Sequence, residues 1–404
     1  MARRALGPAA PAPVALRWRP ALAWVVLALA LAGCAPRPSP WSGPASGLRI
    51  LATAHIAPGT EWGGSPFGGI SGIDQDPRSG DYLLISDDRA VHGPARVYAL
   101  RLHLDPERGQ ARPEITGMRS LQAPDGQPFA PARRARPGVD VPDAEAVRWL
   151  PGAQRFLWTS EGDFARGFGP QLRVAHADGR HLRRIPLPPS FVPSAGAGPR
   201  RNGSLEGLAL APDGRTAWLA MELPWLQDGP PASAAAPGAP VRFTAIDVGS
   251  GEPLRQIAYQ PDAASQPRRL PLGPELNGVS EILADGPHHL LVLERAYSTG
   301  RGFSARLYRI DTRKGSDTRG LAALQPGNHH PPPKELVADF TGLGVPVDNL
   351  EGMAWGPALP GGGCLLVLVS DDNFNPAQRT QFIAAQYRPP GGGHGSCGTT
   401  GGSP

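Results

Sequence analysis

The sequence of 404 residues has very little lysine, and this shortage shapes its charge. Lys314 and Lys334 are the only lysines, so arginine supplies almost all of the positive charge. The net charge of +5 falls to 5 − 4 = +1 without residues 1–33, which hold four arginines and no acid. No basic segment with interleaved aromatic residues remains, which argues against a nucleic-acid partner.

Several motifs that carry chemistry are also missing. The ten histidines form no H-E-x-x-H, so a zinc site of that kind is not expected. The segment Gly69-Ile70-Ser71-Gly72-Ile73 lacks the final glycine of the G-x-S-x-G nucleophile elbow. No phosphate-binding P-loop occurs. These absences argue against a serine hydrolase, a zinc protease and a P-loop nucleotide hydrolase.

The N-terminal residues 1–34 hold arginines, then the apolar stretch AWVVLALALAG, then a cysteine. A basic segment before an apolar run too short for a comfortable membrane span predicts a secretory signal peptide. Its end, LAGC, resembles a bacterial lipobox, which implies that Cys34 is acylated; the alternative is an ordinary signal peptide with a chance cysteine. We therefore expect an exported lipoprotein on the periplasmic side, anchored by its lipid to the outer membrane, with residues 35–47 as a flexible tether.

Two further cysteines, Cys364 and Cys397, would lie in an oxidising compartment. A disulfide between them and two unpaired thiols are both compatible with the sequence. Cys397 belongs to the Gly-rich residues 389–404, which we predict to be a disordered tail.

The content of Gly 52 and Pro 49 leaves little room for long helices and favours short strands. A strand–turn–strand pattern recurs five times, in residues 70–88, 144–163, 205–223, 280–297 and 350–373. Further strand-like runs follow each hairpin, which makes four strands per repeat.

A repeat of this length, about 70 residues, predicts one all-β domain over residues 48–388. We expect a β-propeller with five four-stranded blades, a sixth degenerate blade being left open; a β-sandwich would not explain the period. The run 48–57 would complete the last blade, so that pairing of the N- and C-terminal strands closes the ring and removes exposed sheet edges.

Acids at the open ends of the hairpins are the strongest functional signal. Glu206 and Glu222 lie at equal distances from one turn, so they are expected to face each other across the strands. The five predicted pairs are Ser71 with Asp87, Glu145 with Glu161, Glu206 with Glu222, Glu281 with Glu294, and Glu351 with Asp371. Because the first strand of a propeller blade lines the central channel, these pairs should gather at one mouth of it.

Nine carboxylates at one mouth would repel one another unless protons or cations neutralise them. Oxygen-only ligands suit Ca²⁺ best. The predicted metal ligands are Asp87, Glu145, Glu161, Glu206, Glu222, Glu281, Glu294, Glu351 and Asp371, with Asp88, Asp163, Asp372, Asn202, Asn277 and Asn349 as neighbours that could extend the site. The alternative is that these acids bond to backbone N–H groups at the corners of the blades.

These hairpins also carry a family resemblance. The segments are GGISGIDQDPRSGDYLLISDDR, DAEAVRWLP, NGSLEGLALAPDGRTAWLAMELP, GVSEILADG and DNLEGMAWGP, and with LLVLVSDDNF and TQFIAAQ they span residues 67–387. In these segments the chain resembles the phytase-like family, the bacterial "esterase-like activity of phytase" proteins. The resemblance implies an exported β-propeller and a link to calcium-dependent hydrolysis of phosphate esters.

Two functions follow as hypotheses. The first is a monomeric, Ca²⁺-dependent hydrolase of phosphate or other esters. Its predicted catalytic residues are Glu145, Glu161, Glu206 and Glu222, and its predicted phosphate-binding residues are Arg89, Arg295 and Arg379, each of which could instead be a solvated surface arginine. The second is a non-enzymatic propeller that binds a ligand or a protein and uses calcium structurally.

Overall fold

Short apolar runs between Gly- and Pro-containing turns fold into β-strands throughout the described part of the chain. The computed structural model describes residues 47–389; the predictions for Cys34, for Cys397 and for the segments around them lie outside these residues. Within 47–389 the helices are two short 3₁₀ turns, η1 (Phe164–Arg166) and η2 (Pro189–Phe191). No helix in this part is long and apolar enough to cross a membrane. The all-β prediction is confirmed.

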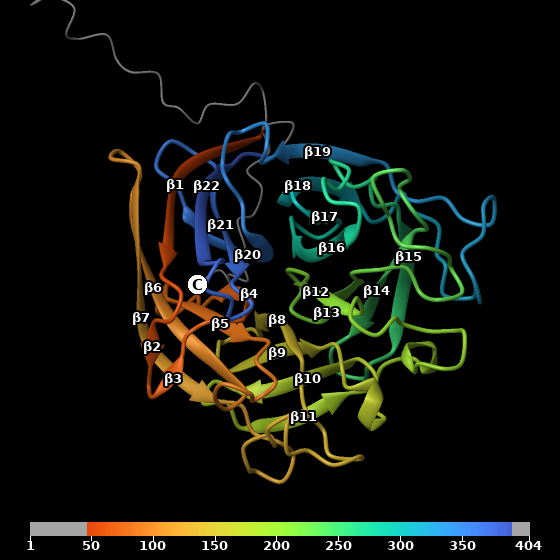
Figure 1. The fold of residues 1–404 in the computed structure, drawn as a ribbon, viewed down its shortest axis with the longest axis horizontal. Helices are drawn as coiled ribbons and strands as arrows, with labels where there is room; N and C mark the ends of the chain where they lie inside the picture. The colour runs from red at the N-terminus through yellow and green to blue at the C-terminus, as the bar shows by residue number, and fades with distance from the viewer. Residues whose placement is uncertain (1–46, 390–404) are drawn as a thin grey trace, which may run out of the picture. The chain divides into compact units, whose positions relative to one another are not determined.

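The strands form sets of four hydrogen-bonded neighbours, which are consecutive in sequence except in the set that contains β1; two of the sets are joined into one eight-stranded sheet (Figure 1). The β4 sheet contains β4 (Ile70–Gln75), β5 (Tyr82–Ser86), β6 (Arg96–Asp105) and β7 (Gln110–Ser120). The β8 sheet contains β8 (Ala144–Trp149), β9 (Arg155–Ser160), β10 (Gln171–His176) and β11 (His181–Ile185). The β12 sheet contains β12 (Leu205–Leu210), β13 (Thr216–Met221), β14 (Val241–Asp247) and β15 (Pro253–Tyr259).

The remaining strands repeat this organisation. The β16 sheet contains β16 (Glu275–Ala284), β17 (His289–Ser298), β18 (Gly302–Asp311) and β19 (Lys334–Asp339). The β20 sheet contains β20 (Asn349–Ala358), β21 (Cys364–Asp371), β22 (Thr380–Tyr387) and β1 (Leu48–Ile56), which pairs antiparallel with β22. A single parallel bridge between Thr53 and Gln110 joins the β20 and β4 sheets, and a small hairpin holds β2 (Glu61–Trp62) and β3 (Ser65–Pro66).

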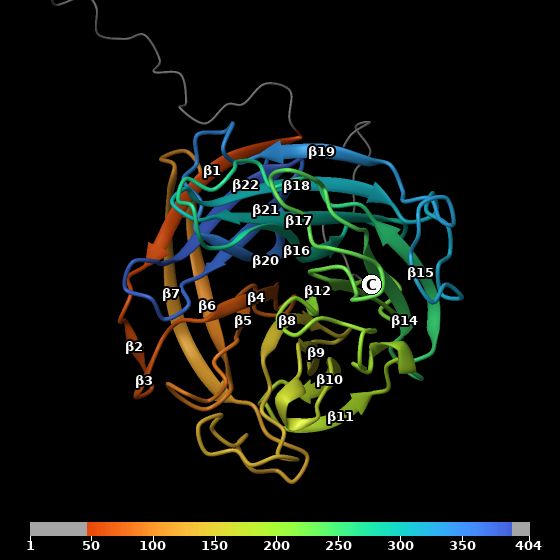
Figure 2. The same ribbon diagram turned by 45° about the vertical axis from the view of Figure 1, so that its right-hand side comes forward.

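The sheets are arranged as the blades of a β-propeller (Figures 1 and 2). Each first strand packs against the first strands of its neighbours: β4 against β8 and β20, β12 against β8 and β16, and β16 against β20. Their close approach explains the glycines at equivalent places in β4, β12 and β20, which are Gly72, Gly207 and Gly352. A Cβ atom on Gly207 would lie 3.0 Å from the backbone N of Ile282 in β16, and one on Gly72 only 2.6 Å from the carbonyl O of Glu145.

Burial follows the position of a strand in its sheet. Every residue of β8 and β21 is buried, because inner strands have sheets on both faces and therefore read as nearly continuous apolar runs. The outer strand β7 is mostly exposed or half-buried. Burying one Leu, Ile or Val side chain stabilises the fold by about 1.5–3 kcal/mol, so the inner strands hold the residues at their ends in place.

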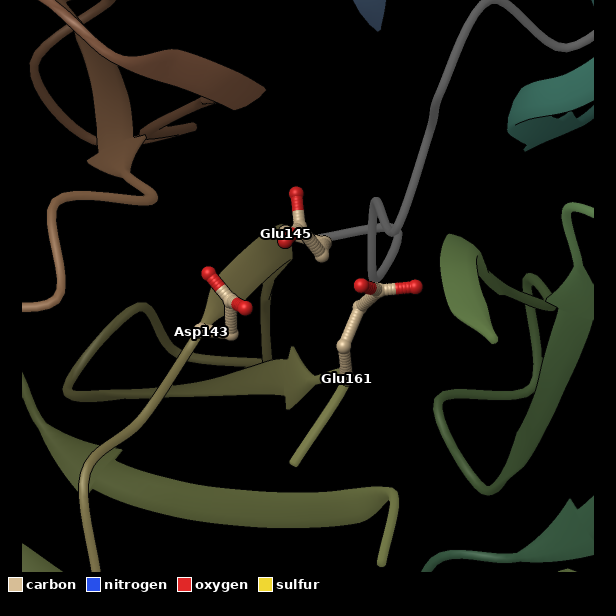
Figure 3. A group of neighbouring side chains, drawn as sticks. All are labelled: Asp143, Glu145 and Glu161. Atoms are coloured by element: carbon tan, nitrogen blue, oxygen red, sulfur yellow. The ribbon is translucent and has the colours of Figure 1, made fainter. Parts of the chain in front are cut away.

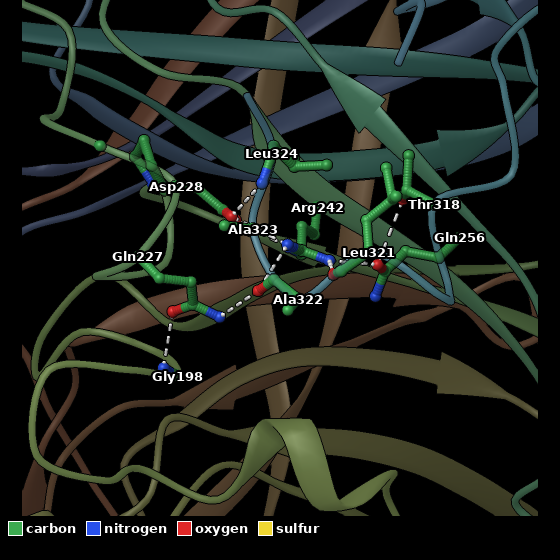
Figure 4. Close-up of polar contacts among 12 residues, drawn as sticks. Gly198, Gln227, Asp228, Arg242, Gln256, Thr318, Leu321, Ala322, Ala323 and Leu324 are labelled. Carbon is green, nitrogen blue, oxygen red and sulfur yellow. Dashed lines mark hydrogen bonds and ion pairs between the residues drawn. The ribbon is translucent and has the colours of Figure 1, made fainter. Parts of the chain in front are cut away.

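A buried arginine ties the segments 225–240 and 319–334 to the β12 sheet (Figure 4). Arg242 on β14 donates from Nε and Nη2 to the two carboxylate oxygens of Asp228, at 2.7 and 2.8 Å. Its Nη1 donates to the side chain of Gln256 at 2.8 Å and to the carbonyl of Leu321 at 3.1 Å. The guanidinium also lies 4.5 Å from the ring centroid of Trp225.

Candidate functional site: a cavity lined by acids

A β-bulge interrupts the first strand of the β12 sheet near its start. Leu205 pairs with Met221 and Gly207 with Ala220, so Glu206 stands between the two pairs without a partner. Bulges re-aim side chains. In each sheet, the residue that comes directly after each member of the last cross-strand pair before the bulge is called a rim residue. In the β12 sheet the rim residues are Glu206 and Glu222. They are not directly opposite each other, because the backbone N of Glu222 donates to the carbonyl of Ser204 at 2.8 Å.

Equivalent bulges occur in the other sheets and define the same rim. The rim residues are Ser71 and Asp87 in the β4 sheet, Glu145 and Glu161 in the β8 sheet, and Glu351 and Asp371 in the β20 sheet. The prediction selected these residues correctly, although the bulge shifts each pair by one position from the expected cross-strand register.

The β16 sheet differs from the prediction. Val279 pairs with Glu294 and Glu281 with Leu293, so the bulge falls on Ser280. The rim residues here are therefore Ser280 and Arg295, and the predicted pairing of Glu281 with Glu294 is wrong. A slip of one residue turns a side chain to the other face of a strand, which removes both acids from the rim.

Glu281 instead lies deeper between the first strands and is fully buried. Its carboxylate accepts hydrogen bonds from the backbone N of Leu208 at 3.0 Å and from Nη2 of Arg148 at 2.7 Å. Burial raises the pKa of Glu281 to about 7, although Arg148 acts in the opposite direction. Since Arg148 comes from β8 and Glu281 from β16, the ion pair links two sheets on either side of the β12 sheet.

Glu294 is occupied by partners within the outer part of the fold. Its carboxylate accepts from the hydroxyl of Tyr259 at 2.6 Å, from Nζ of Lys334 at 2.6 Å and from Nδ2 of Asn277 at 2.6 Å. One of the two lysines of the chain is thus used to neutralise a structural acid. Neither Glu294 nor Asn277 lines the cavity described next.

All of the rim residues except Ser71 and Ser280 line a cavity of about 1510 Å³. Seven of the nine predicted acids line it: Asp87, Glu145, Glu161, Glu206, Glu222, Glu351 and Asp371. Arg89, Arg295, Asn202 and Asn349 line it as well, whereas Arg379 is exposed and does not. The structure therefore brings together most of the predicted site and separates Glu281, Glu294 and Arg379 from it.

Three of these acids face the cavity without a protein partner. Within residues 47–389 the carboxylates of Asp87, Glu145 and Glu206 accept no hydrogen bond and form no ion pair. Burial, followed by repulsion from Glu161 and Glu222, raises the pKa of Glu206 well above its ordinary value. Burial and the neighbouring acids have the same effect on Glu145 and Asp87. A charge buried without a partner costs several kcal/mol, so these groups need either protons or a cation.

Asp143, Glu145 and Glu161 form the tightest group of acids (Figure 3). One carboxylate oxygen from each lies within 4.8 Å of the other two. Ligands on opposite sides of a Ca²⁺ ion, each at about 2.4 Å, are themselves about 4.8 Å apart. Glu161 is held in place by the backbone N–H groups of Gly203 and Ser204, at 2.6 and 2.5 Å. This triad can bind a divalent metal ion.

Asp143 was not among the predicted ligands. It precedes β8, and its separation of two residues from Glu145 places both side chains on one face of an extended chain. The Asp-x-Glu spacing could have revealed it, but Asp143 does not belong to the predicted pairs, whose members are related by a turn. Burial raises the pKa of Asp143 to about 6 despite Arg89, and burial together with Asp143 raises that of Glu161 to about 7.

Arg295 supplies a positive charge within the rim. Its Nη2 lies 3.2 Å from Oε1 of Glu222 and 3.2 Å from Oε1 of Glu351. Burial opposes its charge, but Glu222 and Glu351 outweigh burial and raise the pKa of Arg295 above its ordinary value. Its Nε is buried without a hydrogen-bond acceptor. On another side of the cavity, Nη2 of Arg89 lies 2.7 Å from Asp163.

The predicted neighbours Asp88 and Asp372 have structural partners instead. Asp88 accepts from the buried Arg96 at 2.6 Å and from backbone N–H groups of the loop after it. Asp372 accepts from the backbone N of Gly69 at 3.0 Å and from that of Phe374 at 3.1 Å. Both acids therefore follow the alternative interpretation, in which carboxylates hold the corners of the blades.

Comparison with known proteins gives a family. A family model described as phytase-like, "esterase-like activity of phytase", matches residues 65–374. No curated protein sequence matches the chain.

Solved structures of similar arrangement share little sequence with this chain. A gluconolactonase from Xanthomonas campestris is 13% identical, with 78% of this chain and 71% of that chain covered and a TM-score of 0.31. The catalytic domain of a GH62 α-L-arabinofuranosidase from Coprinopsis cinerea is 10% identical, with 84% and 98% covered and a TM-score of 0.38. A Dyadobacter fermentans protein of unknown function is 9% identical, with 85% and 100% covered and a TM-score of 0.39. At these TM-scores nothing about function rests on them.

Proposed function

The chain belongs to the phytase-like family, and on this basis we propose that it is a Ca²⁺-dependent hydrolase of phosphate or other esters that acts in the acid-lined cavity. The observation that carries the proposal is the set of cavity-facing carboxylates without protein partners, Asp87, Glu145 and Glu206. Structural acids elsewhere in the fold are neutralised by arginine, lysine or backbone N–H groups, whereas these are not.

The ligands fit a hard divalent cation. The triad of Asp143, Glu145 and Glu161 offers three carboxylate oxygens and no sulfur or nitrogen, which suits Ca²⁺. A bound ion would polarise an ester oxygen and make a bound water more acidic. Three protein ligands are fewer than the six to eight oxygens that Ca²⁺ takes, so water or substrate oxygens would complete the site.

The residues around the triad suit the remaining tasks of ester hydrolysis. Glu206, on the next sheet, has a raised pKa and a free carboxylate, the properties of a group that takes a proton from an attacking water. Arg295 presents an unpartnered Nε and is oriented by Glu222, so it can bind an anionic oxygen of the ester. Arg89 offers a second guanidinium at the cavity wall.

We also propose that the propeller has five blades and that β1 closes the ring. Support comes from the antiparallel pairing of β1 with β22, which runs from Leu48 opposite Tyr387 to Ile56 opposite Thr380. With β1 counted as the fourth strand of the β20 sheet, each of the five sheets has four strands. Closure would fix the rim residues of all sheets around one cavity.

The leader supports a further part of the proposal, which concerns location. A lipid on Cys34 would anchor the monomeric protein to the outer membrane, on the periplasmic side. There it would meet esters outside the cytoplasm. The variant Cys34→Ser lacks the thiol that would carry the lipid and should leave the membrane fraction. If it stayed in the membrane fraction, the lipid anchor would be contradicted.

The proposal is tested by removing two of the acids. In the double variant Glu206→Gln with Glu222→Gln we expect Ca²⁺-dependent kcat/KM for phosphate esters to fall at least about 10³-fold, because both the proton acceptor and the partner of Arg295 lose their charge. A matched control, Glu252→Gln with Glu335→Gln, changes two exposed acids outside the cavity and should behave like the wild type.

Calcium binding is measured in the same experiment. At a Ca²⁺ concentration about 100-fold above Kd, the wild type should gain about 2.7 kcal/mol of unfolding free energy, and EDTA should remove it. Stabilisation by Ca²⁺ without turnover of any phosphate or carboxylic ester would favour the non-enzymatic, ligand-binding propeller instead. Activity that survives both EDTA and the double substitution would overturn the proposed function.

A further inference from the structure

We infer that the ester carries a flat apolar group, which binds an apolar row formed by Leu276, Tyr297 and Phe303 beside the acids. The inference rests on the proposed function, because it places the remainder of the same ester. All three side chains line the cavity and are half-buried.

The row exists because the strands of the β16 sheet extend beyond the rim. In the β12 sheet the second strand, β13, ends at Met221, immediately before the rim residue Glu222. In the β16 sheet the second strand, β17, continues past the rim residue Arg295 to Ser298, and β18 returns from Gly302. The extended strands of this sheet therefore form one side of the cavity.

Strand register aligns the three side chains. Leu276 on β16 is opposite Tyr297 on β17, and Tyr297 is opposite Phe303 on β18, so the three share one face. The two rings lie with centroids 4.9 Å apart and planes at 55°. Arg295 lies two residues before Tyr297 and faces the same side. The three side chains of the row carry no charge, and Arg301, in the turn between the strands, lines the cavity beside them at its exposed edge.

The distance along β17 connects the apolar row to the reaction centre. Two residues of a strand span about 7 Å, which separates the guanidinium level of Arg295 from the ring level of Tyr297. An ester whose anionic end binds Arg295 and the acid-held cation would therefore place a group a few bonds away against the row. A planar, apolar group packs best there, because aromatic pairs favour stacked and edge-to-face contacts.

The test compares two phosphate monoesters whose leaving alkoxides are similarly basic, 2-phenylethyl phosphate and propyl phosphate, with the wild type in Ca²⁺. We expect kcat/KM to be about tenfold higher for the phenylethyl ester. Tyr297→Ala and Phe303→Ala should each remove most of this preference, because kcat/KM should fall more for the phenylethyl ester than for propyl phosphate. Tyr297→Leu keeps apolar volume without a ring and should remove part of it. Leu336→Ala, at an exposed position outside the cavity, is the control.

Binding of the non-hydrolysable 2-phenylethylphosphonate, measured by calorimetry in Ca²⁺, separates this inference from the proposed function. Equal turnover of both esters by wild type and variants would overturn the apolar row and leave the hydrolase intact. Absence of turnover, with phosphonate binding weakened about tenfold by Tyr297→Ala, would overturn the hydrolase and support the row. Failure of the wild type to bind the phosphonate would overturn the row whether or not turnover occurs.

Discussion

The Arg242 network and the acid-lined cavity both contain buried charged groups. The charge is fully paired with protein groups in the network, whereas several charges in the cavity have no protein partner among the residues that the structure describes. Arg242 is 2% exposed and every one of its nitrogens has an acceptor among Asp228, Gln256 and the backbone of the loop 319–334 (Figure 4). Glu206 is 8% exposed, and its carboxylate has no hydrogen-bond or ion-pair partner within residues 47–389. The fold can therefore satisfy a buried charge fully where it serves stability.

The comparison indicates what the unpartnered acids are for. A buried charge that lacks a partner destabilises the fold. The unpartnered carboxylates described above lie together at one cavity and are not scattered. Glu281 makes the same point within the centre of the molecule, since it is more deeply buried than Glu206 but is paired with Arg148. Carboxylates left free beside such paired ones are the basis on which we propose that the cavity binds an external cation.

The largest effect should come from breaking the satisfied region. Asp228→Ala leaves the guanidinium of Arg242 buried without its carboxylate, and we expect a loss of about 3–5 kcal/mol in unfolding free energy, measured by urea denaturation. The control is Asp213→Ala, which removes an acid in an exposed turn of the same sheet. If Asp228→Ala cost no more than Asp213→Ala, the Arg242 network would not be the anchor that the comparison requires.

The acids of the cavity should make the unfolding free energy depend on pH. The pKa of Glu161 is about 7 in the folded chain and near 4.5 in the unfolded one, so between these values the folded state binds more protons. The contribution of Glu161 to the unfolding free energy of the metal-free protein should therefore be greatest below pH 4.5. It should fall as the pH rises to 7, by on the order of 3 kcal/mol.

Urea denaturation in EDTA at a series of pH values measures this slope. Glu161→Gln should flatten it, and saturating Ca²⁺ should do so in the wild type, because the cation replaces the protons. If the unfolding free energy changed equally with pH in the wild type and in Glu161→Gln, the cavity acids would not be the groups whose pKa is raised by folding.

The same contrast explains which features could be predicted from the sequence. The rim acids recur at a fixed place in each hairpin, so their pattern alone identified Glu145, Glu206 and Glu351. The register of β16 was missed because the equivalent positions hold Ser280 and Arg295, while acids stand one residue away at Glu281 and Glu294 and imitate the pattern of the other hairpins. Hence Arg295 was assigned to phosphate binding without its place among the rim residues being recognised.

The buried arginines were the larger omission. Arg96, Arg173 and Arg242 lie on the third strands of their sheets and are almost fully buried, each beside an aspartate. The partner aspartates lie at irregular separations of 8, 33 and 14 residues from these arginines. Only folding brings such pairs together, so no fixed spacing in the sequence predicts them.

The smallest effect concerns the one cation among the rim residues, and it sharpens the comparison because Arg295 belongs to both kinds of region. Its Nη2 neutralises Glu222 and Glu351, while its Nε remains free for a ligand. Arg295→Lys keeps the charge but loses the planar fork, so the ammonium cannot serve the two carboxylates and an anion together. We expect KM for a phosphate ester to rise about tenfold with a smaller change in kcat, and Tm to stay nearly constant, since the charge is kept. Arg301→Lys, at an exposed position on the cavity edge, should leave KM within twofold of the wild type. A similar rise in KM for both variants would mean that the cavity attracts anions by overall charge and not through the geometry of Arg295.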